Sequence, residues 1–271
     1  MSHLLFQLSL AAYLAAAAVY TVFFIRQKKT LHTVARVIFC VAAGLHTVNI
    51  AARYVEAEHT PITSIHEIIS FFAWSLACCY LSFRWRYAVK NFGSFAVLLI
   101  TILMLAATAA PQAILPLPPE LRTWLLPVHA SISIVAYAFL SLAAIGGLMY
   151  LIQERQLKQK HFGFFYHRLP SLEALDNLNQ HCIGIGFLLM TLGMSIGTVW
   201  AFQLGGHRGL GWHTKIISAM ITWLLYAGLM HHRFVQGWRG RRAALLTVLA
   251  FAAVLLTFWL LLMKGVADYG A

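Results

Sequence analysis

Histidine is the residue type through which this sequence could do chemistry. The chain of 271 residues has 13 histidines, most of them in long apolar segments or near the ends of such segments. Neutral imidazole is a good ligand for haem iron, and two opposed histidines make a six-coordinate site. One set of histidines falls toward one end of the apolar segments and another set toward the opposite end. The first set is His46, His59, His66, His129, His207 and His213, and the second is His32, His161, His167, His231 and His232.

The first set of histidines has the companions that a haem pocket needs. Aromatic rings would pack against the macrocycle, and cations would meet its propionate groups. Both kinds of residue occur at the same end of the apolar segments, so haem is one candidate ligand there. The rings are Trp74, Trp124, Trp200, Trp212 and Tyr269, and the cations are Arg53, Arg122, Arg208 and Lys215.

A plainer interpretation of these residues stays open. A histidine at a helix end is often an interfacial residue with a satisfied hydrogen bond, and Trp and Tyr form belts at both membrane interfaces. Zinc is disfavoured, because the sequence has neither an H-E-x-x-H motif nor paired Cys and His spacing. The sequence also lacks a G-x-S-x-G motif, a P-loop and a pair of intramembrane carboxylates, so we expect no enzyme acting alone. The residues by themselves leave haem and other ligands unresolved.

The composition indicates that these residues are carried by membrane helices. Hydrophobic residues make up 61% of the chain and charged residues 10%, whereas an average soluble domain has about 45–50% and about 25%. A membrane-spanning helix needs about 20 mostly apolar residues. We therefore expect an all-α fold, a polytopic membrane helix bundle with about eight transmembrane helices. The expected spans are 4–25, 34–52, 67–83, 92–110, 126–152, 181–202, 214–231 and 243–263.

The net charge of +12 is explained by the orientation of these helices. Fifteen of the 20 Lys and Arg residues fall in the connections after the first, third, fifth and seventh spans. Lys and Arg gather in cytoplasmic loops, so these connections face the cytoplasm and both termini lie outside. Membrane lipid is then the expected surrounding, and no nucleic-acid partner is needed to explain the charge.

Three local patterns carry smaller predictions. Leucines recur at a spacing of three in residues 171–178, which predicts a short amphipathic helix on the inner membrane surface. Gly193-x-x-x-Gly197 allows close contact between helices, and we expect it to serve packing within the bundle. The four cysteines, interpreted as small buried apolar residues, are Cys40, Cys78, Cys79 and Cys182.

Several stretches, in the same order and with similar spacing, resemble the cytochrome c assembly family, which includes CcsA, CcmC and a HemX/YpjD-like group. The stretch from Arg53 to Trp74 is similar to the R-W-x-x-x-x-H-x-P-x-S-N-x-Y-E-S-x-x-F-x-x-W of CcsA-like proteins. Residues 126–137 look like the helix that carries the family's first outer haem-ligating histidine, at His129. The resemblance runs from about residue 40 to the end of the chain.

The C-terminal part contains both agreements with the family and departures from it. Residues 197–201, with Trp200, look like the approach to a tryptophan-rich signature, and residues 227–233 resemble the inner histidine motif at His231. The signature W-G-x-x-W-x-W-D-P-K-E is reduced to residues 212–215, WHTK, which is closer to the HemX/YpjD-like branch. Ala267 stands where the family has its second outer histidine. By position alone, His213 or His207 could supply the missing ligand.

The resemblance implies a haem-handling integral membrane protein for c-type cytochrome biogenesis, in the bacterial cytoplasmic membrane. It would present non-covalent, b-type haem at the outer face to an assembly partner protein and apocytochrome c, as one subunit of a cytochrome c synthetase complex. The alternative is a HemX-like regulator of haem synthesis or of membrane-complex assembly, without tight haem binding. A single domain would cover 1–271, with 1–33 least covered by the resemblance. The expected haem ligands are His129 and His213, the packing rings Trp74, Trp200 and Trp212, the propionate cations Arg208 and Lys215, and the inner path or second site His46 and His231, with His207 as a further candidate.

Overall fold

The computed structural model is an all-helical bundle. It describes the backbone at 1–86, 89, 91–114, 117, 122–160, 163–203 and 209–269, and the side chains there except at 84–86, 209–215 and 257–269. Each of the eight expected spans corresponds to one helix of this described part, in the expected order. The helices are α1 (Ser2–Arg26), α2 (Lys29–Ala57), α3 (Ile65–Arg86), α4 (Phe92–Thr108), α5 (Leu125–Lys158), α6 (Leu172–Gln203), α7 (Gly209–Phe234) and α8 (Arg241–Tyr269).

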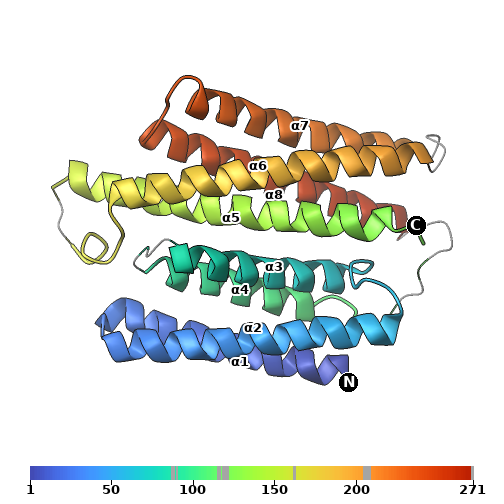
Figure 1. Ribbon diagram of the computed structural model, residues 1–271, viewed down its shortest axis with the longest axis horizontal. Helices are drawn as coiled ribbons and strands as arrows, with labels where there is room; N and C mark the ends of the chain where they lie inside the picture. Colours follow the sequence, from blue (N-terminus) through green and yellow to red (C-terminus); the bar gives the residue numbers. More distant parts are fainter. Residues whose placement is uncertain are drawn as a thin grey trace.

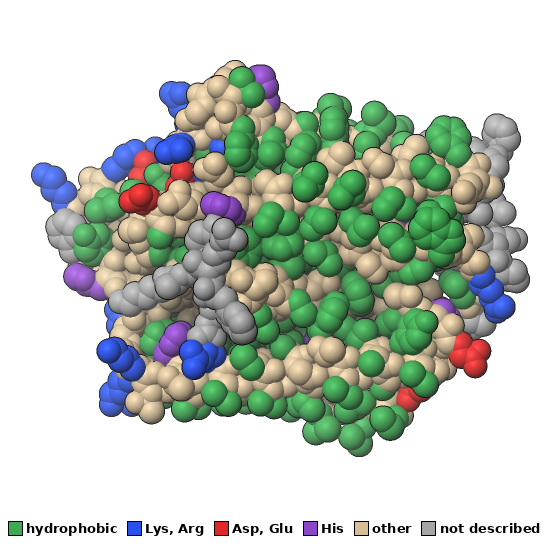
Figure 2. Space-filling view, in the orientation of Figure 1, with side chains coloured by type: hydrophobic (Ala, Val, Ile, Leu, Met, Phe, Trp, Pro, Cys, Tyr) green, Lys and Arg blue, Asp and Glu red, His purple; other side chains and the backbone are tan. Residues whose placement is uncertain are grey.

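The helices have the length and composition of membrane spans. Within the described residues, α1, α2, α3, α5 and α6 are long and apolar enough to cross a bilayer, and α4 is a shorter apolar helix. Leu, Val and Ile side chains are exposed along most of the outward faces, for example Val55 at 74% and Leu188 at 61%. Figure 2 shows this apolar girdle, with Lys and Arg gathered mainly at the left end of the view. The chain is therefore an integral membrane protein, with its cations concentrated at one end of the bundle.

The bundle consists of two halves of four helices each. In the first half, α1 packs on α2 and α4, and α3 packs on α4. In the second half, α5 packs on α6 and α8, and α7 also packs on α6 and α8. The halves meet chiefly where α3 lies against α5 (Figure 1). The start of α1 and the end of α8 lie at the same end of the bundle, opposite most of the cations. Both termini therefore lie on the same side of the membrane, as expected. We call the end of the bundle that carries the termini the outer end, and the end that carries most of the cations the inner end.

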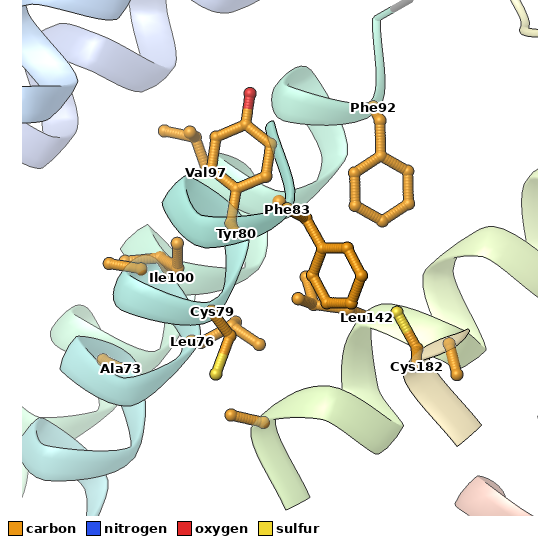
Figure 3. Close-up of a cluster of buried hydrophobic side chains, with 14 of the residues drawn as sticks. Ala73, Leu76, Cys79, Tyr80, Phe83, Phe92, Val97, Ile100, Leu142 and Cys182 are labelled. Atoms are coloured by element: carbon orange, nitrogen blue, oxygen red, sulfur yellow. The ribbon is translucent and has the colours of Figure 1, made fainter. Parts of the chain in front are cut away.

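Large apolar side chains fill the junction between the halves. Phe83 of α3 packs edge-to-face on Phe139 of α5, with ring centroids 5.5 Å apart. Leu142 of α5 is fully buried near Phe83 (Figure 3). Cys79 and Cys182 are buried in the same cluster as free thiols, as expected. Cys40, by contrast, is exposed and Cys78 half-buried, so only two of the four cysteines are core residues.

The expected surface helix at 171–178 does not form as a separate element. These residues are the first turns of α6, which begins at Leu172 and continues without interruption to Gln203. The Ser171 hydroxyl caps the start by accepting a hydrogen bond from the Ala174 backbone N–H at 3.2 Å. Leu175 and Leu178 are buried in the bundle. The apolar stripe that suggested a membrane surface is instead covered by neighbouring helices.

The glycine pair on α6 serves packing within the bundle, as predicted. Helices α5 and α6 run side by side over much of their length. A Cβ added at Gly193 would lie 2.5 Å from the Ser133 hydroxyl oxygen of α5, which is closer than real Cβ contacts come. The absence of a side chain therefore lets the two helices approach each other at their outer ends.

Candidate functional site

The imidazole of His129 is held in a defined orientation near the outer end of the second half. His129 lies in the second turn of α5, and its Nδ1 is 2.7 Å from the backbone carbonyl oxygen of Gly193 on α6. A carbonyl oxygen can only accept, so Nδ1 carries the proton. In the neutral ring, Nε2 then keeps its lone pair and is the atom that can bind a metal. Nε2 has no hydrogen-bond partner among the described residues, and the side chain is half-buried.

A tryptophan from the neighbouring helix lies beside this imidazole. Trp200, on the last turns of α6, has its ring centroid 6.3 Å from that of His129, with 33° between the ring planes. Only 9% of Trp200 is exposed, so its ring is part of the packed end of the bundle. The structure therefore brings together two of the residues expected at a haem site, one from α5 and one from α6.

The remaining outer candidates lie outside the described side chains. His207 and Arg208 fall in the segment between α6 and α7 that the structure does not describe. Trp212, His213 and Lys215 belong to the first turns of α7, whose backbone alone is described. Helix α6 ends and α7 begins at the end of the bundle where α5 begins (Figure 1), so these turns lie at the same end as the second turn of α5, which carries His129.

His46 lies in the other half of the molecule and is completely enclosed. None of its surface is exposed, and its Nε2 is 3.0 Å from the Ser70 hydroxyl of α3. The ring of Tyr13 from α1 stands edge-on to it, with centroids 5.7 Å apart. Trp74 also belongs to this half, where its indole N–H donates to the Thr47 hydroxyl of α2 at 2.9 Å. In the described structure neither residue is in contact with the pair of His129 and Trp200.

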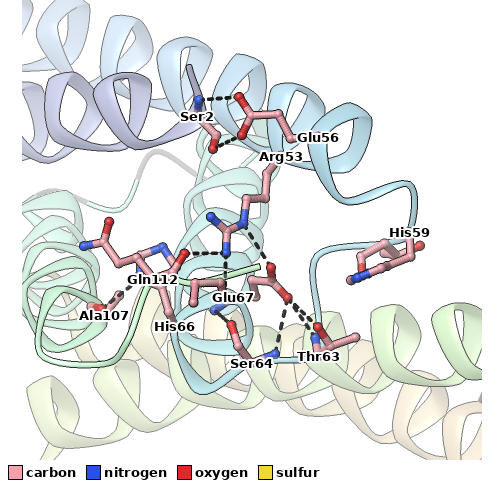
Figure 4. A network of polar contacts seen from close by, with 12 residues as sticks. Ser2, Arg53, Glu56, His59, Thr63, Ser64, His66, Glu67, Ala107 and Gln112 are labelled. Carbon is pink, nitrogen blue, oxygen red and sulfur yellow. Dashed lines mark hydrogen bonds and ion pairs between the residues drawn. The ribbon is translucent and has the colours of Figure 1, made fainter. Parts of the chain in front are cut away.

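A buried ion pair occupies the outer end of the first half. Arg53 Nε donates to Glu67 Oε1 at 3.0 Å, and the two side chains are 10% and 2% exposed (Figure 4). Arg53 Nη2 also donates to the backbone carbonyls of Gln112 and Ala113, at 2.9 and 3.3 Å. The sequence suggested Arg53 as a cation for propionates, but its guanidinium is already engaged in holding the segment after α4.

Glu67 closes the first turn of α3 with its second carboxylate oxygen. Its Oε2 accepts from the Thr63 N–H and hydroxyl and from the Ser64 N–H, at 3.0, 2.9 and 3.3 Å. The Ser64 hydroxyl in turn accepts from the Glu67 N–H at 3.2 Å. This reciprocal pattern is a capping box. The S-x-x-E spacing at 64–67 before an apolar run was the sequence signal that could have identified it.

Only a small cavity lies beside this network. It is lined by residues that include Asn49, His66 and Ser70, and it has room for about one water molecule. His66 is buried and its Nδ1 donates to the Ala107 carbonyl at 2.8 Å. This cavity among the polar residues of the first half is far too small for a porphyrin.

His231 lies at the opposite end of the bundle from His129. It is exposed in the last turn of α7, and its ring centroid is 5.8 Å from that of His232. His232 itself stacks on Trp238 at 4.5 Å and contacts the Gln236 side-chain oxygen through Nδ1 at 2.8 Å. His46 and His231 belong to different halves and do not share one site. In the part of the chain that the structure describes, no three His, Cys, Asp or Glu residues are grouped so as to hold a metal ion.

A second buried ion pair, next to His231, was missed by the sequence analysis. Arg233 Nη2 donates to the Asp176 carboxylate at 2.8 Å, and Nη1 donates to Asn179 Oδ1 at 3.0 Å. The Gly240 N–H also reaches this carboxylate, at 3.3 Å. The contacts join the inner ends of α6, α7 and α8. The sequence signal was Asp176 between Leu175 and Leu178 on the apolar side of this stretch, but the interpretation of 171–178 as a surface helix assigned no partner to this carboxylate.

Comparison with known proteins gives one consistent result. The family model described as "Cytochrome C assembly protein" matches residues 62–266. A relative named "Cytochrome c biogenesis protein CcsA" from Guillardia theta is 29% identical over 83% of this chain and 81% of its own length. Proteins of the same name from Synechococcus sp. strains CC9902 and JA-3-3Ab are 30% and 28% identical, over 82% of this chain and 81% and 80% of theirs. The matched region contains α3 to α7 and most of α8, and so includes His129 and Trp200.

Proposed function

The chain belongs to the cytochrome c assembly protein family, and from this membership we propose that it handles haem in the biogenesis of c-type cytochromes. Haem is then the cargo, bound without a covalent link as b-type haem. The protein presents it at the outer face of the membrane, where apocytochrome c receives it. The observation that carries this proposal is the imidazole of His129, whose Nε2 is left available while Nδ1 is tied to Gly193.

The chemistry of His129 suits an axial ligand of haem iron. A histidine that ligates a metal generally donates its other ring N–H to a carbonyl or carboxylate, which fixes the tautomer and raises the basicity of the ligating nitrogen. The Nδ1 contact at 2.7 Å supplies that carbonyl. Trp200 offers an apolar face beside the ring, against which part of a macrocycle can pack.

The first turns of α7 supply the other proposed contacts. His213 is the proposed second axial ligand, with His207 as the other candidate, since Ala267 leaves the family's position without an imidazole. Trp212 would pack on the macrocycle. Trp74, which lies in the first half, would join it when the two halves separate and expose its ring to the haem. The proposed partners of the propionates are Arg208 and Lys215.

The chain does no bond chemistry alone in this proposal. It acts as one subunit of a cytochrome c synthetase complex, with an assembly partner that brings apocytochrome c to the outer face. The proposed location is the bacterial cytoplasmic membrane. The cations gather at the end opposite the proposed site, which orients that site away from the cytoplasm.

His46 and His231 are proposed as two separate positions on the inner path of haem. His231 is exposed and could receive haem without rearrangement. His46 would require α1, α2 and α3 to separate, because its ring is enclosed and bonded to Ser70. Haem bound at His46 would therefore be a transient state of the first half.

Haemin titration of the purified protein tests the proposal. Wild type should give a Soret band of a histidine-ligated haem, and His129→Ala should weaken haemin binding at least tenfold. His213→Ala should convert the spectrum from six-coordinate to five-coordinate. His181→Ala is the control, because this histidine is exposed on the inner part of α6, where its Nδ1 bonds to the Asn177 carbonyl. A wild type that binds no haemin would contradict the proposal.

A second candidate function is favoured by one specific observation. Residues 212–215 and Ala267 depart from the haem-binding pattern in the direction of the HemX-like group. The chain would then regulate haem synthesis or membrane-complex assembly without tight haem binding. Deletion of the gene distinguishes the two functions. Loss of c-type cytochromes with normal haem levels supports the first, and altered levels of a haem-synthesis enzyme with intact cytochromes support the second.

A further inference from the structure

Gly197 faces the imidazole of His129 with no side chain between them. A Cβ built at this position would lie 2.5 Å from Cε1, 2.6 Å from Nδ1 and 3.3 Å from Nε2 of the ring. All three of its nearest neighbours are thus atoms of His129. Real Cβ atoms essentially never come closer than about 3 Å to another heavy atom. An alanine at this position would displace the ring from where it now lies.

The ring rests on α6 between two glycines that act in different ways. Gly193, one turn earlier, offers its backbone carbonyl to Nδ1 at 2.7 Å. The missing side chain of Gly197 provides the space in which the ring lies close to the helix backbone, within reach of that carbonyl. We call Gly193 and Gly197 together the glycine cradle.

Close approach to the ring is a property of this position and not of every glycine on α6. Gly184 lies on the same helix, and a Cβ added there would meet nothing within 4 Å. Both residues are helical, and alanine is the better helix former at either position. The requirement for glycine at 197 therefore comes from His129 and not from the backbone of α6.

We propose that Gly197 is a positioning residue of the haem site, which keeps the His129 ring against Gly193 so that Nε2 faces the haem. This inference rests on the proposed function, since it assigns a purpose to the orientation of the ring. The cradle fixes the tautomer and the direction of the lone pair before haem arrives. A ring pushed out of the cradle would lose its carbonyl partner, and either ring nitrogen could then carry the proton.

The orientation of the ring can be measured without haem. In bilayers containing protein labelled with [15N]histidine, the signals of His129 are assigned by their loss in His129→Ala. In its neutral form, the wild-type ring should carry the proton on Nδ1 and leave Nε2 unprotonated. Gly197→Ala should change the chemical shifts of both nitrogens and give a mixture of tautomers, whereas Gly184→Ala should leave them at the wild-type values. Unchanged signals in Gly197→Ala would overturn the inference.

Haemin titration then connects the orientation to binding. Gly197→Ala should weaken haemin binding at least tenfold and alter the Soret band, while Gly184→Ala stays within twofold of wild type. A Gly197→Ala protein with wild-type affinity and spectrum would overturn the inference. A wild type that binds no haemin would instead contradict the proposed function, and the haem-free signals would still decide whether Gly197 positions the ring.

A double-mutant cycle with His129→Ala covers the case in which Gly197→Ala destabilises the protein; if the single variant does not fold at all, the double variant should fold again. The three atoms nearest to the added methyl group all belong to the imidazole of His129, so removing the imidazole removes the clash. Gly197→Ala should lower the midpoint of thermal unfolding in wild type and should leave it unchanged or raised in a His129→Ala background. Equal effects in the two backgrounds would mean that the residues are not coupled, and the inference would be wrong.

Discussion

Single residues in this protein differ in whether their polar atoms are used internally. Arg53 and Glu67 satisfy each other and the surrounding backbone in a buried network (Figure 4). His129 uses one ring nitrogen and leaves the other without a partner among the described residues. This difference agrees with a structural role for Arg53 and Glu67 and with the ligand role proposed for His129.

Glu67→Ala should destabilise the first half strongly. Removing one partner of a buried ion pair leaves the other charge uncompensated, at a cost of about 3–5 kcal/mol. The capping box at the start of α3 would be lost as well. The measurement is the unfolding free energy in detergent, with Glu58→Ala as control, because Glu58 is an exposed carboxylate close in sequence. Equal stability of the two variants would show that the pair contributes nothing.

Residue types and spacing indicated part of this site and missed the rest. His129 could be singled out because its neighbours in sequence resemble a known motif. The partners of Arg53 could not be predicted. They lie 14 or more residues away in the sequence, and the number of charges in a chain does not tell which carboxylate or carbonyl a guanidinium contacts. The Gly193 carbonyl was beyond reach for the same reason, because every residue has a carbonyl and only the packing of α5 on α6 selects this one.

At the level of elements, α6 is the helix that connects the two ends of the second half. Its outer turns hold Trp200 and the glycine cradle, and its inner turns hold Asp176 and Asn179. Hydrophobic runs predicted its membrane span well, because a bilayer demands about 20 apolar residues. They could not predict the inner extension, since an amphipathic stripe looks the same whether lipid or a neighbouring helix covers it.

The continuity of α6 predicts a distance. A helix rises 1.5 Å per residue, so spin labels at the exposed positions Glu173 and Leu188 should lie about 22 Å apart. Double electron–electron resonance, on a background with the four cysteines replaced, measures this separation. A surface helix turning by a right angle near residue 181 would give about 16 Å instead, and that value would rule out the continuous helix.

The inner ends of α6, α7 and α8 should depend on Asp176. Arg233 is only 4% exposed, and its guanidinium pairs with the Asp176 carboxylate. Asp176→Ala would leave this buried cation without its partner. We expect a loss of about 3 kcal/mol in the free energy of unfolding. Glu173→Ala, an exposed carboxylate of the same helix, should change it by no more than about 0.5 kcal/mol. An equal loss in both variants would assign the effect to the helix start and not to the ion pair.

For the whole molecule, the distribution of cations predicts which end faces the cytoplasm. Glu58 lies at the outer end of α2 and Lys29 at its inner end, and both are exposed. In whole cells, a membrane-impermeant maleimide should label Glu58→Cys but not Lys29→Cys, on the cysteine-replaced background. Permeabilised cells provide the control, since both positions should then react. Labelling of Lys29→Cys alone in intact cells would invert the topology.

The number and order of the helices could be predicted from the sequence, but their division into two halves could not. Apolar runs define where a helix crosses the membrane, and alternating cations define its direction. Which helices touch depends on shape, for example on Phe83 of α3 meeting Phe139 of α5. Such contacts between apolar side chains leave no distinctive signal in a sequence whose hydrophobic residues amount to 61%.

The junction between the two halves has a consequence for how the polypeptide could be encoded. The packing of α3 against α5 supplies most of the contact between the halves, and Arg53 binds the carbonyls of Gln112 and Ala113 within the first half. We therefore expect the halves to associate without a covalent link between them. A gene interrupted between the codons for Ala113 and Arg122 would yield two fragments, each with four helices and its own buried ion pair. Inserted separately into one bilayer, they should meet by lateral diffusion and restore the parent protein.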